Sequence, residues 1–363
     1  MPQAQKSHRP LPVTIEEIGR DWLVAALRMR CPDVSVQNVE IVDINRGTCT
    51  KIRLRFDMDE AGKRAGVPET VILKGGFESH SRSLGFMHEM EVRGYRDVLS
   101  AMGLHSPACY FADYDRERQQ GIVIIEDLVA RGVTFCNPLK PQTHDQVARR
   151  LTMLARFHAK SWNSPELAPG RRWNVLPEMM AVAPSYMKQY VEPNAWRRFV
   201  ELPRGAAASV RFHDPRWMAD ALDRMFILSR RLPQCVIHGD THLGNLYIDP
   251  DGTPGFFDSQ PQRAPAVAEV AYHVAGALDP ADRPRWEGAL VRHYLDELGR
   301  NGVAPPDFDA WMQSYAAFLA LGFCIFMVNE SFYQPEAINT AYTARFSAAM
   351  IDHRTMDVLK AIA

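Results

Sequence analysis

One short stretch in the second half of this 363-residue chain gathers residue types that could do chemistry. From Cys235 to Gln260 it reads CVIHGDTHLGNLYIDPDGTPGFFDSQ, with two His, four Asp and one Asn set among apolar runs. Three interpretations are open: a metal cage, a polar structural turn, or a loop that transfers a phosphoryl group. A metal cage would use His238, Asp240 and His242. Zinc sites usually need three or four supported ligands, and the sequence offers no remote Cys/His pair to complete one.

The phosphoryl-transfer interpretation accounts for three residues that the other two leave unexplained. A kinase needs a carboxylate beside the attacking hydroxyl and oxygen-bearing side chains on the Mg²⁺ ion that bridges the phosphates. Asp240 and Asn245 have the D-x4-N spacing of a kinase catalytic loop, and Asp258 follows a strand-turn-strand segment. We therefore predict Asp240, Asn245 and Asp258 as catalytic residues, with Asn245 and Asp258 as the metal ligands. Asp249 and Asp251 fall in the turn and are expected to be solvated turn formers.

The segment HGDTHLGNLY…GFFDSQ resembles the catalytic segment of the aminoglycoside phosphotransferase and choline kinase-like family, in particular its ecdysteroid-kinase-like bacterial members. Four more segments resemble family elements and follow the family order over about residues 40–275: VILKGG, MEVRGYRDVL, IVIIEDL and LARFHAKSW. The resemblance implies a two-lobed protein-kinase-like fold that uses ATP and Mg²⁺. Gly239 replaces the Arg of protein kinases, and the D-F-G and A-P-E motifs are absent, which favours a small-molecule substrate over a protein.

The resemblance also implies a lysine that contacts the ATP phosphates and a glutamate that holds it. Lys74 ends the apolar strand VILK and is expected to reach the α- and β-phosphates. The helix that follows offers Glu89 and Glu91, which point to different faces because they are two residues apart. The E-x3-Y spacing in EVRGY matches the family pattern and favours Glu91 as the partner.

Two further segments are candidates for nucleotide contacts. The turn Asn45–Thr50, NRGTCT, would cover the phosphates through backbone N–H groups, with Gly47, Thr48 and Thr50 as the contacts; the alternative is an ordinary hairpin turn. Glu126 and Leu128 lie where the chain is expected to enter the hinge and recognise adenine through main-chain groups. The alternative role of the acidic side chains at this point is to cap or order the turn.

Hydrophobic periodicity predicts the elements that must position these residues. Strands are expected at 34–44, 51–58, 69–76 and 121–128, with short strands at 246–248 and 255–257. A capping box at Thr14–Glu17 is expected to begin an N-terminal helix. Further helices are expected at 85–103, 144–162, 176–192, 214–231, 283–300, 307–331 and 336–361. The predicted fold class is α+β, with a small β-rich N-terminal lobe and a larger helical C-terminal lobe.

This order of elements suggests three divisions of the chain. Residues 1–13 are expected to be a flexible tail, 14–127 a nucleotide-binding lobe, and 128–363 a helical lobe with the catalytic loop and the acceptor-binding region. The formal charge of −1 and the well-mixed charges argue against nucleic acid or an anionic membrane as partner. The run Tyr315–Val328 is too short to span a bilayer and is expected to be a buried helix. We expect a cytoplasmic protein with reduced thiols, since no secretory signal is recognisable. No Cys pair has C-x-x-C spacing, which argues against a zinc ribbon or a thioredoxin-like site.

The function expected from the sequence is ATP-dependent phosphorylation of a hydroxyl on a small molecule. Catalytically silent nucleotide binding on the same fold is an alternative, and a metal-dependent hydrolase a weaker one. A bulky, partly apolar alcohol is favoured as acceptor because the C-terminal regions are rich in aromatic residues and poor in clustered acids. Those aromatic residues are Trp173, Tyr186, Tyr190, Trp196, Trp217, Trp311, Tyr315, Phe332 and Tyr333. The sequence does not indicate an oligomeric state.

Overall fold

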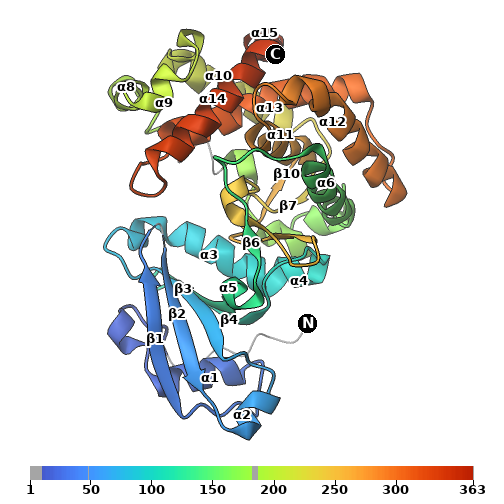
Figure 1. Cartoon of the computed structure of the whole chain (residues 1–363). Helices are drawn as coiled ribbons and strands as arrows, with labels where there is room; N and C mark the ends of the chain where they lie inside the picture. Colours follow the sequence, from blue (N-terminus) through green and yellow to red (C-terminus); the bar gives the residue numbers. More distant parts are fainter. Residues whose placement is uncertain (1–9, 48, 182–186, 363) are drawn as a thin grey trace. The chain divides into compact units, whose positions relative to one another are not determined.

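The computed structural model describes residues 10–47, 49–181 and 187–362. Two compact units make up the chain (Figure 1): residues 1–134 with 249–260, and residues 135–248 with 261–363. The first contains the antiparallel sheet and the second most of the helices, so the predicted α+β class is confirmed. The polar segment around Cys235–Gln260 is divided between them, because Asp240 and Asn245 belong to the second unit and Asp258 to the first.

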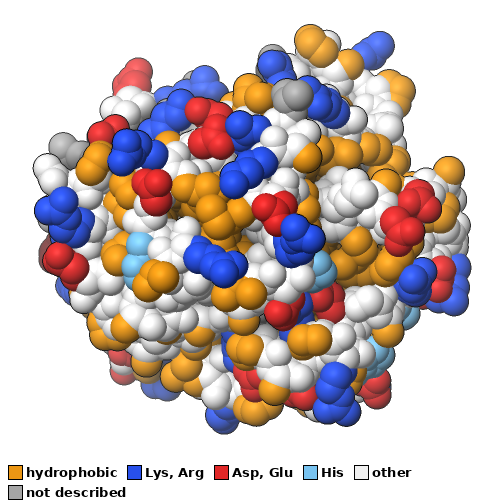
Figure 2. Space-filling view, turned by 90° about the horizontal axis from the view of Figure 1, so that it is seen from above, with side chains coloured by type: hydrophobic (Ala, Val, Ile, Leu, Met, Phe, Trp, Pro, Cys, Tyr) orange, Lys and Arg blue, Asp and Glu red, His pale blue; other side chains and the backbone are white. Residues whose placement is uncertain are grey.

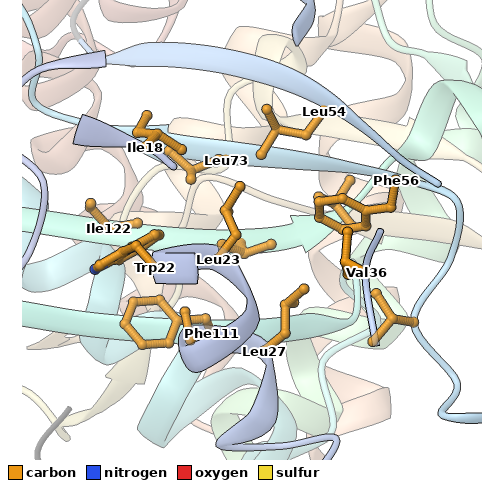
Figure 3. Packing of buried hydrophobic residues seen from close by; sticks show 14 of the residues in the cluster. Ile18, Trp22, Leu23, Leu27, Val36, Leu54, Phe56, Leu73, Phe111 and Ile122 are labelled. Carbon is orange, nitrogen blue, oxygen red and sulfur yellow. The ribbon is translucent and has the colours of Figure 1, made fainter. Parts of the chain in front are cut away.

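The first unit is built on a five-stranded antiparallel sheet in the order β1-β2-β3-β5-β4. Its strands are β1 (Asn38–Asn45), β2 (Thr50–Asp57), β3 (Thr70–Gly75), β4 (Cys109–Asp115) and β5 (Gln120–Glu126). Strand β2 alternates buried and more exposed residues, as a strand with one covered face must. Helix α1 (Arg20–Arg28) covers that face, and Trp22 meets Phe111 edge to face at 5.6 Å between ring centroids (Figure 3).

Helix α3 (Gly85–Arg93) packs against β5 and continues the first unit. A π-helical turn (Gly94–Val98) and α4 (Leu99–Met102) follow it, so the helix predicted over 85–103 contains one wide turn. The remaining elements of the unit are α2 (Glu60–Arg64), α5 (Leu128–Arg131), β9 (Pro254–Phe256) and 3₁₀ turns at Ile15–Glu17 and Ser81–Leu84. Strand β6 (Thr134–Phe135) lies where the chain passes into the second unit.

Helices dominate the second unit. They are α6 (His144–Ala159), α8 (Pro193–Val200), α9 (Pro203–Ala206), α10 (Pro215–Ser229), α11 (Ala266–Ala277), α12 (Arg283–Arg300), α13 (Phe308–Val328), α14 (Glu336–Asp352) and α15 (Thr355–Lys360). Short strands β7 (Cys235–Ile237) and β10 (Gln262–Ala264) pair antiparallel, and β8 (Leu246–Ile248) follows the loop that contains Asp240 and Asn245. Turns of 3₁₀ helix lie at Pro165–Leu167, Arg172–Val175, Val210–Phe212 and Leu243–Asn245. On the face shown in Figure 2, Lys and Arg side chains lie among Asp and Glu side chains.

Helix α13 is the buried helix that the apolar run predicted. Its 21 residues make it long and apolar enough to cross a membrane by length and composition alone. However, 83% of its most apolar window is buried inside the protein, where it packs against α11 and α14. Its apolar surface is therefore explained by the core of the second unit.

Several predicted elements need correction. The capping box at Thr14 is wrong, because Thr14 precedes a 3₁₀ turn and caps nothing, while α1 begins only after Gly19. A capping box does form between Thr143 and Gln146 at the start of α6. Residues 336–361 form two helices, because Arg354 takes a left-handed conformation with φ of 50° between them.

Two more predicted segments fall partly outside the residues that the structure describes. The helix predicted over 176–192 falls partly on residues 182–186, outside the described residues. In the predicted N-terminal tail, residues 1–9 also lie outside, but Leu11 is buried and the Pro12 carbonyl accepts a hydrogen bond from Gln120. The last residues before Thr14 are therefore packed onto the first unit.

Candidate active site

Lys74 is the centre of a buried charge cluster in the first unit. It lies on β3 with 3% of its side chain exposed, and its ammonium contacts one carboxylate oxygen of Glu91 and one of Asp258. Burial disfavours the charged ammonium, but the attraction of the surrounding groups, Asp258 first, raises the pKa of Lys74 well above 10.5. Lys74 is therefore a permanent, immobilised cation on the sheet face that α1 leaves uncovered.

Glu91 is the carboxylate of α3 that reaches Lys74, and Glu89 points elsewhere. Glu89 accepts hydrogen bonds from Arg93 at 2.8 Å and from Arg116 at 3.2 Å. The two glutamates diverge because residues two apart on a helix lie on different faces. The structure thus brings together Lys74 and Glu91, and leaves Glu89 in a partly exposed arginine cluster.

Asp258 is held at this cluster by its backbone as well as by its side chain. It follows β9 in a left-handed conformation with φ of 55°, a region that Asp tolerates better than most residues. Its N–H donates to the Tyr95 hydroxyl at 3.3 Å, and Tyr95 lies four residues after Glu91 in the π-helical turn. The same helical segment therefore supplies the partner of Lys74 and a support for Asp258.

The turn Asn45–Thr50 is tied to the segment after β3. Thr50 is fully buried and its hydroxyl donates to the Glu78 carboxylate at 3.0 Å, which Arg46 also contacts. The Gly47 carbonyl lies 3.0 Å from Nε2 of His80. Thr48, the third predicted contact in this turn, lies outside the described residues. The hydroxyl hydrogen of Thr50 is therefore already donated to the Glu78 carboxylate.

The acids that follow β5 order the chain around them. Asp127 caps α5 by accepting from the N–H groups of Val129 and Ala130, and it pairs with Arg53 at 2.7 Å. Glu126 accepts from Arg131 at 2.8 Å, and its own N–H donates to the Ala108 carbonyl. Of the two roles predicted for these side chains, the structure supplies the ordering role; Leu128 is the first residue of α5 and is buried.

In the second unit, Asp240 and Asn245 are neighbours on one loop. Asn245 Nδ2 donates to Oδ2 of Asp240 at 2.8 Å and to the Asp240 carbonyl at 3.1 Å. Oδ1 of Asp240 accepts the Tyr272 hydroxyl at 3.0 Å. Nδ1 of His242 accepts the Gly244 N–H, so its Nε2 carries the hydrogen and lies 3.5 Å from Oδ2 of Asp240. Donors therefore surround this carboxylate, which remains about one third exposed.

Glu269 anchors the start of the same loop. Its carboxylate is buried and accepts the N–H groups of His238 at 3.0 Å and Gly239 at 2.7 Å, with His158 Nε2 at 2.9 Å. Burial opposes ionisation of Glu269, but these contacts, His158 first, outweigh it and lower the pKa of the carboxyl below 4.5. The resulting fixed anion holds the backbone that precedes Asp240.

Helix α11 supplies three supports of the loop from one face. Glu269, Tyr272 and His273 are spaced i, i+3 and i+4, so their side chains lie together. His273 Nδ1 bonds the Thr241 carbonyl at 2.9 Å, and burial, followed by the charge of Asp240, raises the pKa of Tyr272 well above 10. Tyr272 thus remains a hydroxyl donor to Asp240. Neither this helix nor the role of these three residues was predicted from the sequence.

Two expectations about the polar segment need correction. Asp249 is not a solvated turn former, because His105 contacts it at 2.5 Å and Arg131 at 2.9 Å, whereas Asp251 is exposed and accepts the Thr253 N–H. Among the described residues, no group of three or more His, Cys, Asp and Glu side chains is arranged to hold a metal ion, which argues against the alternative of a metal cage at His238, Asp240 and His242.

The comparison with protein families decides the classification. Residues 91–309 match the model of the phosphotransferase enzyme family, which covers more than half of the chain. The chain belongs to the phosphotransferase enzyme family. The match includes Glu91, the catalytic loop and Asp258, and membership supports a small-molecule phosphotransferase. No curated protein sequence matches this phosphotransferase significantly.

Two solved structures share the fold of this phosphotransferase. A predicted aminoglycoside phosphotransferase of Ralstonia eutropha JMP134 is 13% identical, with a TM-score of 0.54. The match includes 94% of this chain and 98% of that one. A choline kinase of Cryptosporidium parvum Iowa II is 14% identical, with a TM-score of 0.53. The match includes 93% of this chain and 98% of that one. At such low identity these matches establish the protein-kinase-like fold, as predicted, and leave the substrate open.

Two buried imidazoles should make the stability of this phosphotransferase depend on pH. Burial, followed by the charge of Lys74 for His88 and of Arg150 for His273, lowers the pKa of each from 6.5 to about 4. At a pH between these two pKa values, the unfolded chain binds a proton at each imidazole and the folded chain does not. Stability is therefore lost as pH falls from 6.5 towards 4. The loss is up to roughly 3 kcal/mol per imidazole.

Urea unfolding at a series of pH values, with wild type beside His273→Asn, measures this effect. The difference between the two proteins isolates the imidazole from carboxylates that titrate in the same range. We expect the variant to lose less stability than wild type on acidification. Parallel pH profiles for the two proteins would contradict a neutral buried His273.

Proposed function

We propose that this chain is an ATP- and Mg²⁺-dependent kinase that phosphorylates a hydroxyl group of a small molecule. The observation that carries the proposal is the buried Lys74 ammonium, held by Glu91 and Asp258 on one sheet face. A buried cation is costly unless carboxylates compensate it, and a structural core has no need of such a cluster. A site that must receive a polyanion does need it, because fixed positive charge can bind phosphate without reorganisation.

The residues of the first unit fit a nucleotide and its metal ion. Lys74 would bind the α- and β-phosphates, and Glu91 would keep its ammonium in place. Gly47, Thr48 and Thr50 belong to the turn that would cover the phosphates, chiefly through main-chain N–H groups. Glu126 and Leu128 flank the segment whose main chain would recognise adenine. Bound Mg²⁺ would neutralise charge on the phosphates during transfer.

Asp240 is the proposed acceptor of the hydroxyl proton. Its carboxylate is partly exposed and is oriented by Tyr272 and Asn245, so it could accept a hydrogen bond from the substrate hydroxyl and align it for attack. Asn245 and Asp258 are the proposed metal ligands, since amide and carboxylate oxygens suit Mg²⁺. Because these two residues belong to different units, their convergence on one ion is part of the proposal.

The acceptor class proposed from the aromatic residues now rests on a smaller set. Trp173, Trp196, Trp311 and Tyr315 are buried in the core, so these four residues give no support to the proposed acceptor class. Tyr186 lies outside the described residues. Phe332 is 66% exposed and its ring lies 4.0 Å from that of Tyr333, and Tyr190 and Trp217 are partly exposed. The proposal of a bulky, partly apolar alcohol as acceptor therefore rests on Tyr190, Trp217, Phe332 and Tyr333.

Calorimetric titration with ATP, with and without Mg²⁺, tests the nucleotide half of the proposal. We expect Mg²⁺-dependent binding of ATP and no comparable affinity for adenosine. Screening a panel of alcohols for ATP consumption then tests transfer and identifies the acceptor class. Nucleotide binding without consumption by any alcohol would favour the catalytically silent alternative. Firmly bound zinc without ATP affinity would favour a hydrolase.

Replacing Asp258 by Ala should remove the Mg²⁺-dependent part of ATP binding. The variant lacks the only carboxylate proposed as a metal ligand, so ATP should bind equally weakly with and without the ion. Asp251→Ala is the matched control, because Asp251 is an exposed carboxylate of the preceding turn. Calorimetry on the three proteins measures the effect, and a D258A variant that keeps its Mg²⁺ dependence would remove Asp258 from the metal site.

A further inference from the structure

A second lysine lies beside Lys74 on the same face of the sheet. Strand β2 pairs antiparallel with β3 in a register that sets Lys51 directly opposite Lys74. Side chains of directly opposed residues project from the same face, with Cβ atoms about 5 Å apart. Like charges in this arrangement destabilise a sheet, so two opposed lysines call for an anion between or beside them. From the sequence, Lys51 was predicted only as the first residue of a strand.

Asp258 is the anion that both lysines share in the structure. Its Oδ1 contacts the Lys74 ammonium, while its Oδ2 lies 3.8 Å from the Lys51 ammonium. The two lysines are held very differently. Lys74 is 3% exposed and also paired with Glu91, whereas 44% of the Lys51 side chain is exposed. Lys74 is therefore anchored, and Lys51 is the cation that can leave the carboxylate at little cost.

The charges of these four groups balance while the Asp258 carboxylate lies beside both ammonium groups. Lys51 and Lys74 carry two positive charges, and Glu91 and Asp258 two negative charges. A metal ion on Asp258 would compete for the carboxylate with both ammonium groups and would repel the loosely held one. A nucleotide triphosphate carries more negative charge than one Mg²⁺ neutralises, so it would offer the displaced ammonium a new partner.

We propose that Lys51 is a second phosphate-binding cation that exchanges partners when the site fills. It neutralises Asp258 in the free protein and turns to the nucleotide phosphates when Mg²⁺ takes that carboxylate. The inference rests on the proposed function, since it assumes that Asp258 binds the metal ion of MgATP. It assigns Lys51 two effects of opposite sign: competition with the metal ion alone, and attraction for the metal–nucleotide complex. An incidental surface ion pair would have neither.

Two binding measurements on Lys51→Met test this exchange. Mn²⁺ alone, followed by its paramagnetic resonance, should bind at least about threefold more tightly to the variant, because a competing cation is gone. MgATP, measured by calorimetry, should bind about tenfold more weakly, because one charge-assisted phosphate contact is lost. Adenosine, which has no phosphate, should bind equally to both proteins. Lys51→Arg keeps the positive charge and should restore most of the MgATP affinity.

Arg55→Met is the matched control. Arg55 is a cation on the same face of β2, four residues along, and pairs with the Glu40 carboxylate at 3.0 Å on the surface. Its replacement should leave both affinities within about twofold of wild type, and thermal unfolding should show that each variant is folded. Wild type that binds no MgATP would overturn the proposed function and this inference with it. Normal MgATP binding by wild type and K51M alike, or a parallel fall in both affinities of K51M, would overturn the role of Lys51 alone.

Discussion

Asp240→Asn is expected to lower the rate of phosphoryl transfer by about 100- to 10,000-fold, the range typical for loss of a general base. The amide has nearly the shape of the carboxylate but cannot accept the hydroxyl proton. It would also present an N–H₂ group to Tyr272 or Asn245, which donate to Asp240 in the wild-type protein. Substrate alignment and proton acceptance should therefore fail together, and the loss should appear in kcat.

Nucleotide binding should survive this change. Asp240 lies in the second unit, whereas the Lys74 cluster proposed to hold the phosphates lies in the first, so MgATP affinity should stay within about threefold of wild type. Asp251→Asn is the control, since it makes the same chemical change in an exposed turn of the polar segment. Steady-state kinetics and calorimetry on the three proteins check both halves. Full turnover by D240N would exclude Asp240 as the base.

Lys74→Met should have the largest combined effect on stability and binding. Removing the ammonium leaves the buried Glu91 carboxylate uncompensated, and breaking a buried pair in this way typically costs about 3–5 kcal/mol. MgATP affinity should fall by about 10- to 100-fold, because a charge-assisted phosphate contact is lost. Urea unfolding and calorimetry measure the two effects separately.

The double variant Lys74→Met, Glu91→Gln separates the structural from the functional role of Lys74. It removes the uncompensated charge, so much of the lost stability should return, while Lys51 still faces Asp258. MgATP binding should stay weak, because no anchored ammonium has been restored. An unfolding free energy of K74M equal to that of wild type would contradict the buried pair. Wild-type MgATP affinity in the double variant would contradict the phosphate role.

The catalytic segment and the Lys74 environment were predictable because their signals are local. D-x4-N spacing places Asp240 and Asn245 on one loop, and their contact at 2.8 Å follows from that short separation. Strands β2, β3 and β5 alternate or run apolar as buried strands do, so Lys74 could be placed at a strand end. Glu91 could be preferred over Glu89 from the family spacing and helix geometry alone.

The support behind the loop of Asp240 and Asn245 could not be predicted because its helix has no solvent-exposed face. All 12 residues of α11 are buried, so the hydrophobic pattern shows no 3.6-residue period to mark a helix. Glu269, Tyr272 and His273 then look like isolated polar residues in an apolar run. The contact of Lys51 with Asp258 depends on strand register, and no local pattern encodes it. At Thr14, a sequence that matches a capping box was outweighed by the tight turn that precedes α1.

The most direct test of phosphoryl transfer to a small molecule is analysis of the products formed from MgATP in the presence of an alcohol panel. Wild type and D240N should be run side by side, with phosphorus NMR to detect a new phosphomonoester. We predict stoichiometric ADP and phosphomonoester from at least one bulky, partly apolar alcohol with wild type, and almost none with D240N. Tight Mg²⁺-dependent ATP binding with no phosphomonoester from any alcohol, or equal product with D240N, would contradict the account.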